Sequence, residues 1–227
     1  MGTLSVVGTP IGNLGDMTLR AIDVLKKADA IACEDTRVTS KLLTRYEIQK
    51  PLLVFHARSG RLATERILAL LAEDKHVALV TDAGTPGISD PGSALVSEVR
   101  ERLGSDVRIE SVPGASALTA ALSIAGVPTN EFLFLGFLPH KKGRQTLFKE
   151  IAEEERTIVF YESPHRIEKT LESLKGVLGE DRKVTIAREL TKIHESLVSG
   201  SASEVRDYFV SHESEVRGEF VVIVSAC

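Results

Sequence analysis

The chain has 227 residues, of which 43% are hydrophobic and 26% charged, and its formal net charge at pH 7 is −4. These values exclude extensive disorder and a polycation that coats nucleic acid, but they leave room for a local basic patch. The two cysteines, Cys33 and Cys227, lie far apart and show no metal-binding spacing. Neither a disulfide framework nor a zinc site is therefore expected, and a reducing cytoplasm is the default location.

Strands and helices are predicted to alternate in the first half of the chain. The N-terminal residues form an apolar strand without a basic region, which argues against a signal peptide. Periodicity predicts strands over 4–7, 30–33, 52–55, 77–80 and 107–110, and helices over about 19–28, 37–45, 62–72, 93–103 and 115–125. The last helix lies in an uncharged stretch that also contains prolines and glycines, so a membrane span is not expected there. Repeated β-α-β order predicts a mostly parallel sheet with right-handed crossovers.

The alternation is interrupted at residues 127–130, with sequence VPTN, and then resumes. Strands are predicted over 132–135, 157–161, 184–188, 195–199 and 218–224, with helices over 144–155 and 164–178. A capping box, Ser201 to Glu204, opens one more helix. We therefore expect an α/β protein of two α/β domains, residues 1–126 and 127–227.

Three glycine-containing loops follow predicted strands of the first domain. The first, VGTPIGN over 7–13, is not a dinucleotide fingerprint, because Pro10 and Asn13 stand where glycine is required. The second, TDAGTPGISDPG over 81–92, combines glycines, prolines and aspartates; the third is VPGASA over 112–117. Each could be a purely structural turn. If they share the carboxyl edge of one sheet, their exposed backbone groups suit a polar small molecule such as a nucleoside.

Together with other motifs, these loops resemble the tetrapyrrole-methylase-fold family of S-adenosylmethionine-dependent methyltransferases. Within it, the sequence is similar to the ribosomal RNA small subunit methyltransferase I group, which methylates the ribose 2′-hydroxyl of a cytidine in the decoding region of 16S rRNA. The resemblance covers nearly the whole chain in order. Besides the three loops it rests on CEDTRVTSKLL (33–43), FYESPHR (160–166), RELTKIHE (188–195) and RGEFV (217–221).

The resemblance implies a mostly parallel first sheet, a mixed second sheet, S-adenosylmethionine in a cleft between the domains, and a homodimer. By motif position it implies cofactor contacts for Pro10, Asp82, Ala83, Gly84, Thr85, Gly87, Ile88, Ser116, Ala117, Tyr161, Leu190, Gly218 and Glu219.

Methylation of a hydroxyl requires a group that accepts its proton. The matching motifs offer Asp35, Glu162 and His165, with Glu34, Lys192 and Glu195 as further candidates. Each has a structural alternative: Asp35 could cap its own helix, and residues 162–165 could simply begin one. The sequence therefore does not decide which of these residues is the catalytic base.

With a net negative charge, RNA contacts must be local. The basic cluster at 139–144 supplies Lys141, Lys142 and Arg144, and one predicted helix face carries Arg37 and Lys41. Charged stripes of this kind often only face water. The six histidines show no ligand spacing, so we expect no metal.

Two rival functions are also compatible with the sequence. One is a uroporphyrinogen-type tetrapyrrole C-methyltransferase of the same fold. The other is a non-catalytic ribosome-assembly or RNA-binding factor, which would bind subunits without consuming S-adenosylmethionine.

Overall fold

The computed structural model describes residues 1–56 and 61–226 and divides into two compact units, Met1–Ser116 and Ala117–Cys227. The predicted boundary, between residues 126 and 127, places helix α5 (Ala117–Ala125) in the first domain. In the structure α5 belongs to the second unit, because it packs on strands of that unit's sheet. Among the residues that the structure describes, no helix is both long and apolar enough to cross a membrane.

The first unit is a parallel sheet with helices on both faces. Its strands are β1 (Gly2–Val7), β2 (Ala30–Cys33), β3 (Leu52–Val54), β4 (His76–Leu79) and β5 (Val107–Val112), in the order β3-β2-β4-β1-β5. The helices between them are α1 (Leu19–Lys27), α2 (Thr36–Arg45), α3 (Arg61–Ala72) and α4 (Gly92–Leu103). All four strand pairings are parallel, as predicted.

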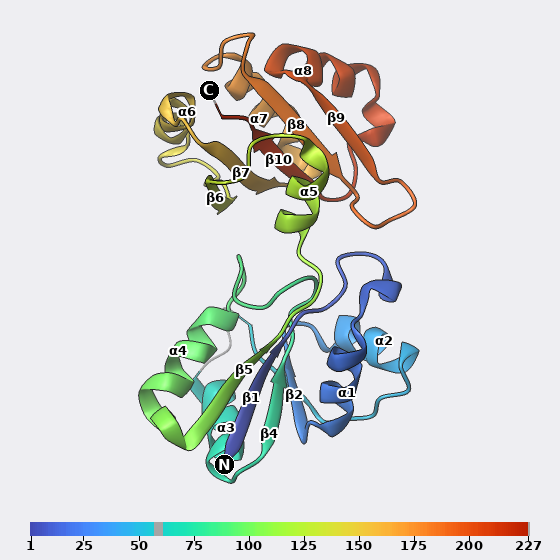
Figure 1. Ribbon diagram of the computed structural model, residues 1–227, viewed down its shortest axis with the longest axis vertical. Coiled ribbons are helices and arrows are strands. Elements are labelled where there is room, and N and C mark those ends of the chain that lie inside the picture. The colour runs from blue at the N-terminus through green and yellow to red at the C-terminus, as the bar shows by residue number, and fades with distance from the viewer. Residues whose placement is uncertain (57–60, 227) are drawn as a thin grey trace. The chain divides into compact units, whose positions relative to one another are not determined.

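Helices lie on both faces of this sheet (Figure 1), and a hydrophobic layer lies on each face. Leu25 of α1 and Leu42 of α2 pack with Ile31 on one face, whereas Leu71 of α3 and Leu95 of α4 join the layer on the other. The chain moves toward β3 along the first face and returns along the second, as expected when every crossover keeps one hand. Because β1 lies between β4 and β5, the loops that follow these three strands emerge side by side.

The second unit is a mixed sheet. Its strands are β6 (Phe132–Phe137), β7 (Thr157–Glu162), β8 (Lys183–Arg188), β9 (Ser196–Ser201) and β10 (Phe220–Val224), in the order β6-β7-β10-β8-β9. Only β6 and β7 are parallel; the other pairs are antiparallel. Helices α6 (Arg144–Glu153), α7 (Pro164–Lys175) and α8 (Ala202–Ser211) share one core with the sheet, and α5 contacts β8 and β10 (Figure 1).

Local sequence signals explain several helix starts. The Thr18 side chain accepts from Ala21 N and begins α1, and the predicted capping box of Ser201 and Glu204 opens α8. The predicted strands and helices are all present, with ends shifted by a few residues. Short 3-10 helices at Leu14–Asp16, Gly104–Asp106 and Glu213–Glu215 were not predicted, since three residues show no periodicity.

Candidate functional site

The three glycine loops of the first unit are joined by hydrogen bonds at the carboxyl edge of the sheet. Thr9 N donates to Gly84 O at 2.8 Å, and Gly84 N donates back to Thr9 O at 3.1 Å. The Thr9 hydroxyl donates to Thr81 O at 3.1 Å, and the Thr85 hydroxyl donates to Ala115 O at 3.1 Å. The second loop is therefore fixed to both others, and the expected convergence of the three loops is present.

Two glycines allow the first and third loops to touch through their backbones. A Cβ on Gly8 would lie 2.7 Å from Gly114 N, and a Cβ on Gly114 would lie 2.8 Å from Gly8 O. Gly8 N also donates to Val112 O at 2.9 Å. No side chain fits at either position, so these glycines are required by close packing and not by a positive φ.

Asp90 holds the second loop in its bent path. Its Oδ1 accepts from Gly87 N and Gly92 N, both at 2.7 Å. Gly87 and Ser89 have φ of +88° and +63°, in the left-handed region that favours glycine. The other oxygen, Asp90 Oδ2, is buried without a hydrogen-bond partner in the described part of the chain. Asp90 thus stabilises the strained bend over residues 87–92, in which the Ile88 side chain is exposed.

The edge of this loop cluster is polar and acidic. Asp82 and Ala83 are exposed, and Asp82 Oδ1 accepts from Asp35 N at 3.1 Å. Next to it, the Thr81 hydroxyl donates to the Glu34 carboxylate. Pro10 is buried in the first loop, and Ser116 ends the unit.

Asp35 acts as the cap of α2. Its Oδ1 accepts from Arg37 N at 2.8 Å, and its Oδ2 lies 2.6 Å from Arg37 Nη2. The side-chain and backbone hydrogen bonds from Arg37 lower the pKa of Asp35 to about 2. A carboxylate that holds its proton so weakly is a poor base, and the capping alternative is the one that the structure supports.

In the second unit, the expected cofactor residues gather at one end of the sheet. Phe220 pairs with both Glu162 and Arg188, so Tyr161, Leu190 and Gly218–Glu219 come from adjacent strand ends. Burial raises the pKa of Tyr161, and its phenol is close to the backbone of Leu118, beside Ala117 at the start of α5.

Glu189 explains why glycine stands at position 218. The Glu189 carboxylate occupies the space that a Gly218 side chain would need, and it accepts from Glu219 N at 3.1 Å. It also accepts from Lys192 Nζ at 2.8 Å. Glu189 and Thr191 adopt φ of +50° and +67°, so this turn is strained.

Lys192 and Glu195, the further base candidates in this segment, are both engaged. Although burial lowers it, the pKa of Lys192 is raised above its ordinary value by the hydrogen bond to Glu189 and the charge of Glu219. Glu195 Oε2 accepts from Thr191 N at 2.5 Å. Neither geometry suits a group that must accept a proton.

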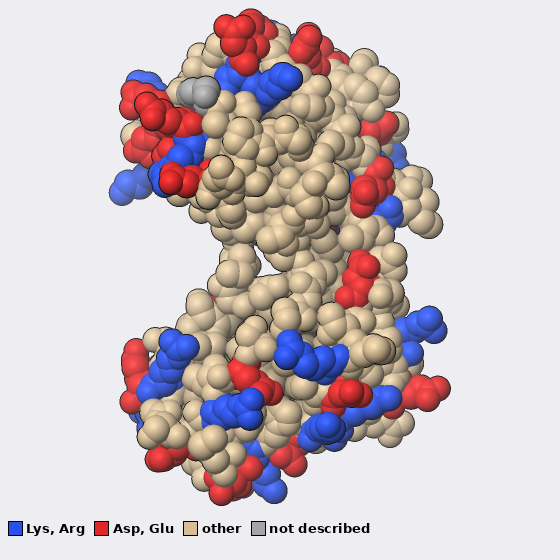
Figure 2. Space-filling model, in the orientation of Figure 1, with Lys and Arg blue, Asp and Glu red and all other residues tan. Residues whose placement is uncertain are grey.

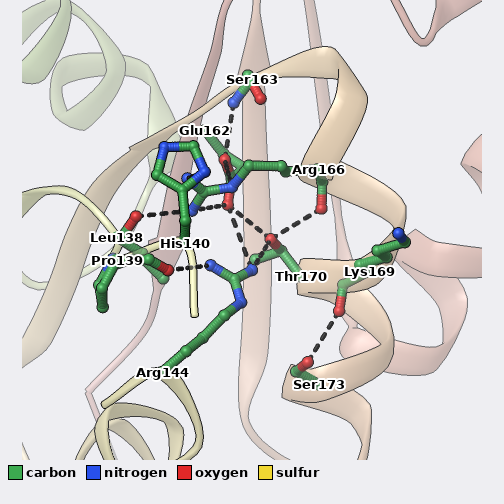
Figure 3. Close-up of polar contacts among 10 residues, drawn as sticks. All are labelled: Leu138, Pro139, His140, Arg144, Glu162, Ser163, Arg166, Lys169, Thr170 and Ser173. Atoms are coloured by element: carbon green, nitrogen blue, oxygen red, sulfur yellow. Dashed lines mark hydrogen bonds and ion pairs between the residues drawn. The ribbon is translucent and has the colours of Figure 1, made fainter. Parts of the chain in front are cut away.

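Glu162 is buried in a cluster with two arginines (Figure 3). Its side chain has no exposed surface, and Oε1 lies 3.0 Å from Arg166 Nε. Oε2 lies 3.5 Å from Arg144 Nη2 and accepts from the Thr170 hydroxyl at 2.7 Å. Ser163 N donates to Oε1 at 2.9 Å. A carboxylate enclosed in this way anchors structure, and its geometry does not fit the expected role of a base.

The predicted RNA-contacting residues differ in their exposure. Lys141 and Lys142 are exposed in the loop between β6 and α6, and Arg37 and Lys41 are exposed on α2. Arg144 points inward instead: its Nη2 donates to the Thr170 hydroxyl at 2.7 Å, and its guanidinium lies over the Phe148 ring. The expectation that Arg144 contacts RNA is therefore not supported by this geometry.

On the face shown in Figure 2, Lys and Arg lie among Asp and Glu, and this face has no broad basic area. The base candidate His165 is exposed on the first turn of α7.

Within residues 1–56 and 61–226, no group of three or more His, Cys, Asp or Glu side chains could hold a metal ion.

A family model described as Tetrapyrrole (Corrin/Porphyrin) Methylases matches residues 3–206 of the chain. The chain belongs to the tetrapyrrole methylase family. A relative in Thermotoga maritima, named ribosomal RNA small subunit methyltransferase I, is 47% identical over 225 residues, which cover 99% of each chain. A relative of the same name in Synechocystis sp. is 46% identical over 226 residues, 99% of this chain and 79% of the relative. By full-length identity, the chain falls in this methyltransferase group of the family.

Solved structures agree on the fold. The methyltransferase CobJ superposes with a TM-score of 0.72 at 20% identity, covering 100% of this chain and 95% of that one. Uroporphyrin-III-C-methyltransferase from Thermus thermophilus has a TM-score of 0.66 at 18% identity, covering 99% and 94%. At such identities the likeness concerns the fold, and it confirms the two α/β units of a tetrapyrrole methylase.

Several residues that hold these loops and turns in place were not among the predicted site residues. Thr9 and Thr81 join two loops, Asp90 stabilises one, and Glu189 fixes the turn at Gly218. Asp90 lies in the motif TDAGTPGISDPG and Glu189 in RELTKIHE, which mark both as candidates. Their partners come from other segments, so their roles depend on the tertiary structure.

Proposed function

We propose that this protein transfers a methyl group from S-adenosylmethionine to the ribose 2′-hydroxyl of a cytidine in the decoding region of 16S rRNA. The observation that carries the proposal is the 47% identity to a ribosomal RNA small subunit methyltransferase I over 99% of both chains. Tetrapyrrole methylation is not favoured, because the structural likeness to a uroporphyrin-III-C-methyltransferase comes with only 18% identity.

The loop cluster of the first unit fits the cofactor in its chemistry. The second loop passes through Gly84 and Gly87 at φ of +85° and +88°, and Asp82 and Ala83 of the same loop are exposed. Backbone amides, carbonyls and a carboxylate can bind the hydroxyl, amine and carboxyl groups of S-adenosylmethionine. Such a backbone-lined edge also allows close approach of a ligand.

We propose cofactor contacts for Pro10, Asp82–Thr85, Gly87, Ile88, Ser116, Ala117, Tyr161, Leu190, Gly218 and Glu219. When bound, S-adenosylmethionine supplies an electrophilic methyl group on a sulfonium. The protein orients the ribose hydroxyl and accepts its proton. Positioning of this kind contributes up to about 7–11 kcal/mol in favourable cases.

His165 is the candidate that we propose as the proton acceptor, since Asp35 and Glu162 are engaged in structural pairs. Imidazole is the side chain most often used for this task. His165→Gln is expected to lower kcat by about 10²–10⁴-fold and to leave the affinity for S-adenosylmethionine unchanged. A variant with the kcat of the parent protein would remove His165 from this role.

RNA contact is proposed for Lys141, Lys142 and the exposed side chains of Arg37 and Lys41. We also propose that the protein works in the cytoplasm as a homodimer, without a metal ion. Ribosomal RNA is present there, and S-adenosylmethionine supplies all the electrophilic chemistry that methyl transfer requires.

The decisive experiment follows a labelled methyl group. The protein is incubated with labelled S-adenosylmethionine and either undermethylated small ribosomal subunits or uroporphyrinogen, and the products are separated. Label in 2′-O-methylcytidine of 16S rRNA supports the proposal. Label on uroporphyrinogen supports the tetrapyrrole reading, whereas subunit binding without any transfer indicates a non-catalytic assembly factor.

A further inference from the structure

The cluster around Glu162 joins the end of β7 to the loop between β6 and α6. Glu162 and Thr170 are fully buried, and the two arginines are mostly buried, with side-chain exposures of 15% for Arg144 and 17% for Arg166. Burying one carboxylate and two guanidinium groups is costly unless each is paired and hydrogen-bonded. The contacts of this cluster provide that pairing, so it acts as one unit.

The two arginines use their remaining donors on the loop backbone (Figure 3). Arg166 Nη2 donates to Leu138 O at 2.7 Å, and Arg144 Nη1 donates to Pro139 O at 3.1 Å. Arg166 Nη1 also lies 3.4 Å from His140 Nδ1. Three consecutive residues, just before the two exposed lysines, are thus tied to a single buried carboxylate.

The loop itself has few internal constraints. Pro139 through Gly143 are exposed, and Gly143 turns into α6 with a φ of +80°. The hydrogen bond from Arg144 N to Lys141 O is long, at 3.3 Å. The place of Lys141 and Lys142 therefore depends on the anchored carbonyls of Leu138 and Pro139. Glu162 keeps the two guanidinium groups, which repel each other, beside those carbonyls.

We propose that Glu162, Arg144 and Arg166 form a positioning clamp, which holds the 138–143 loop so that Lys141 and Lys142 meet RNA phosphates. The proposal rests on the RNA-methylating function proposed above. The clamp residues do not touch the RNA or the methyl donor; they act through the two lysines. Without the Glu162 charge, the arginines lose their common anchor, the loop samples other conformations, and the lysines lose their fixed spacing.

A double-mutant cycle tests this proposal. Dissociation constants for undermethylated small ribosomal subunits are measured with the wild-type protein, Glu162→Gln, Lys141→Ala/Lys142→Ala, and the triple variant. In the wild-type background the lysine substitutions are expected to weaken binding about tenfold and to reduce the salt slope by about 1–2. In the Glu162→Gln background the same lysine substitutions are expected to weaken binding by less than about threefold and to change the salt slope little.

The matched control is Glu65→Gln in the first unit. Glu65 also binds two arginines, Arg102 at 2.8 Å and Arg61 at 3.2 Å, but on the surface and far along the sequence from the loop. In the Glu65→Gln background the lysine substitutions should again weaken subunit binding about tenfold. Calorimetry of S-adenosylmethionine binding and thermal unfolding verify that each variant is folded. If Glu162→Gln does not fold, Arg144→Lys, which keeps the charge but loses the planar fork, replaces it.

If the lysine substitutions weaken subunit binding equally in the wild-type and Glu162→Gln backgrounds, the clamp proposal is wrong. It is also wrong if these substitutions do not weaken binding in either background. A wild-type protein that neither binds nor methylates subunits would instead refute the proposed function. The two failures are therefore distinguishable.

Discussion

Gly8 and Gly114 show how single residues shape the proposed cofactor site. Each lacks the Cβ that would collide with the backbone of the other, so two loops touch directly. The sequence identifies these glycines as parts of loops after strands. It does not reveal that they face each other, because β1 and β5 become neighbours only when the sheet forms.

Gly8→Ala is expected to be strongly destabilising, because its Cβ would lie 2.7 Å from Gly114 N. Backbone on both sides must move, which costs about 1–3 kcal/mol or more of the free energy of unfolding and separates the loops. Urea unfolding and calorimetry with S-adenosylmethionine measure both effects. Gly179→Ala, at an open position, is the control. Equal stability and affinity for the two variants would contradict the close contact.

His76 makes stability depend on pH. Its Nε2 lies 2.8 Å from the buried Ser5 hydroxyl, which donates to Glu110 Oε1 at 2.7 Å. Burial lowers the pKa of His76 below its ordinary 6.5. Below about pH 6.5 the unfolded chain therefore binds more protons than the folded one, and the free energy of unfolding falls as pH falls.

His76→Gln removes this titration and should reduce the loss of stability between about pH 6.5 and 5. Denaturant unfolding at several pH values, compared with the exposed-site variant His212→Gln, checks the effect. The same pH slope for His76→Gln and the wild-type protein would contradict the role of His76.

At the level of elements, the strands and helices follow from hydrophobic periodicity, but their order in the sheet does not. β1 and β2 are consecutive in the chain, yet β4 lies between them. That order depends on long-range pairing. A bulge in β6 was not predicted either. The register of β6 against β7 shifts between Phe134 and Phe137, where Gly136 has a φ of +59°.

Arg182 ties the end of α6 to the end of β10. The residue is buried, and its guanidinium donates to Ile151 O, Ala152 O, Glu154 O and Ser225 O at 2.6–3.0 Å. These include carbonyls of the last turn of α6, which have no partner within the helix. One side chain thus satisfies the backbone of two elements, although the sequence shows it only as a loop arginine.

Arg182→Lys is expected to lower the free energy of unfolding by at least about 2 kcal/mol, because one ammonium group cannot reach all four carbonyls. Chemical denaturation measures the change. Arg206→Lys, at a half-exposed ion pair with Glu172, should change stability by less than about 0.5 kcal/mol. A similar small change for Arg182→Lys would contradict its bridging role.

For the molecule as a whole, the alternation of strands and helices predicted two α/β units, and the motifs in their order predicted the family. The structure adds what depends on tertiary packing. Glu162 lies in a motif, but Arg144 and Arg166 reach it from two different helices, so a candidate base becomes an anchor. Asp35 likewise is a helix cap held by Arg37. Net charge alone, at −4, shows only that RNA binding must be local.

We propose above all that the loops at the carboxyl edge of the first sheet hold the methyl donor. A crystal structure of the protein with S-adenosylmethionine, or with its demethylated product, tests this claim most directly. We predict density against Pro10 and residues 82–88, with the Thr9–Gly84 bridge intact. A ligand bound away from these loops, with the loops unchanged, would contradict the account.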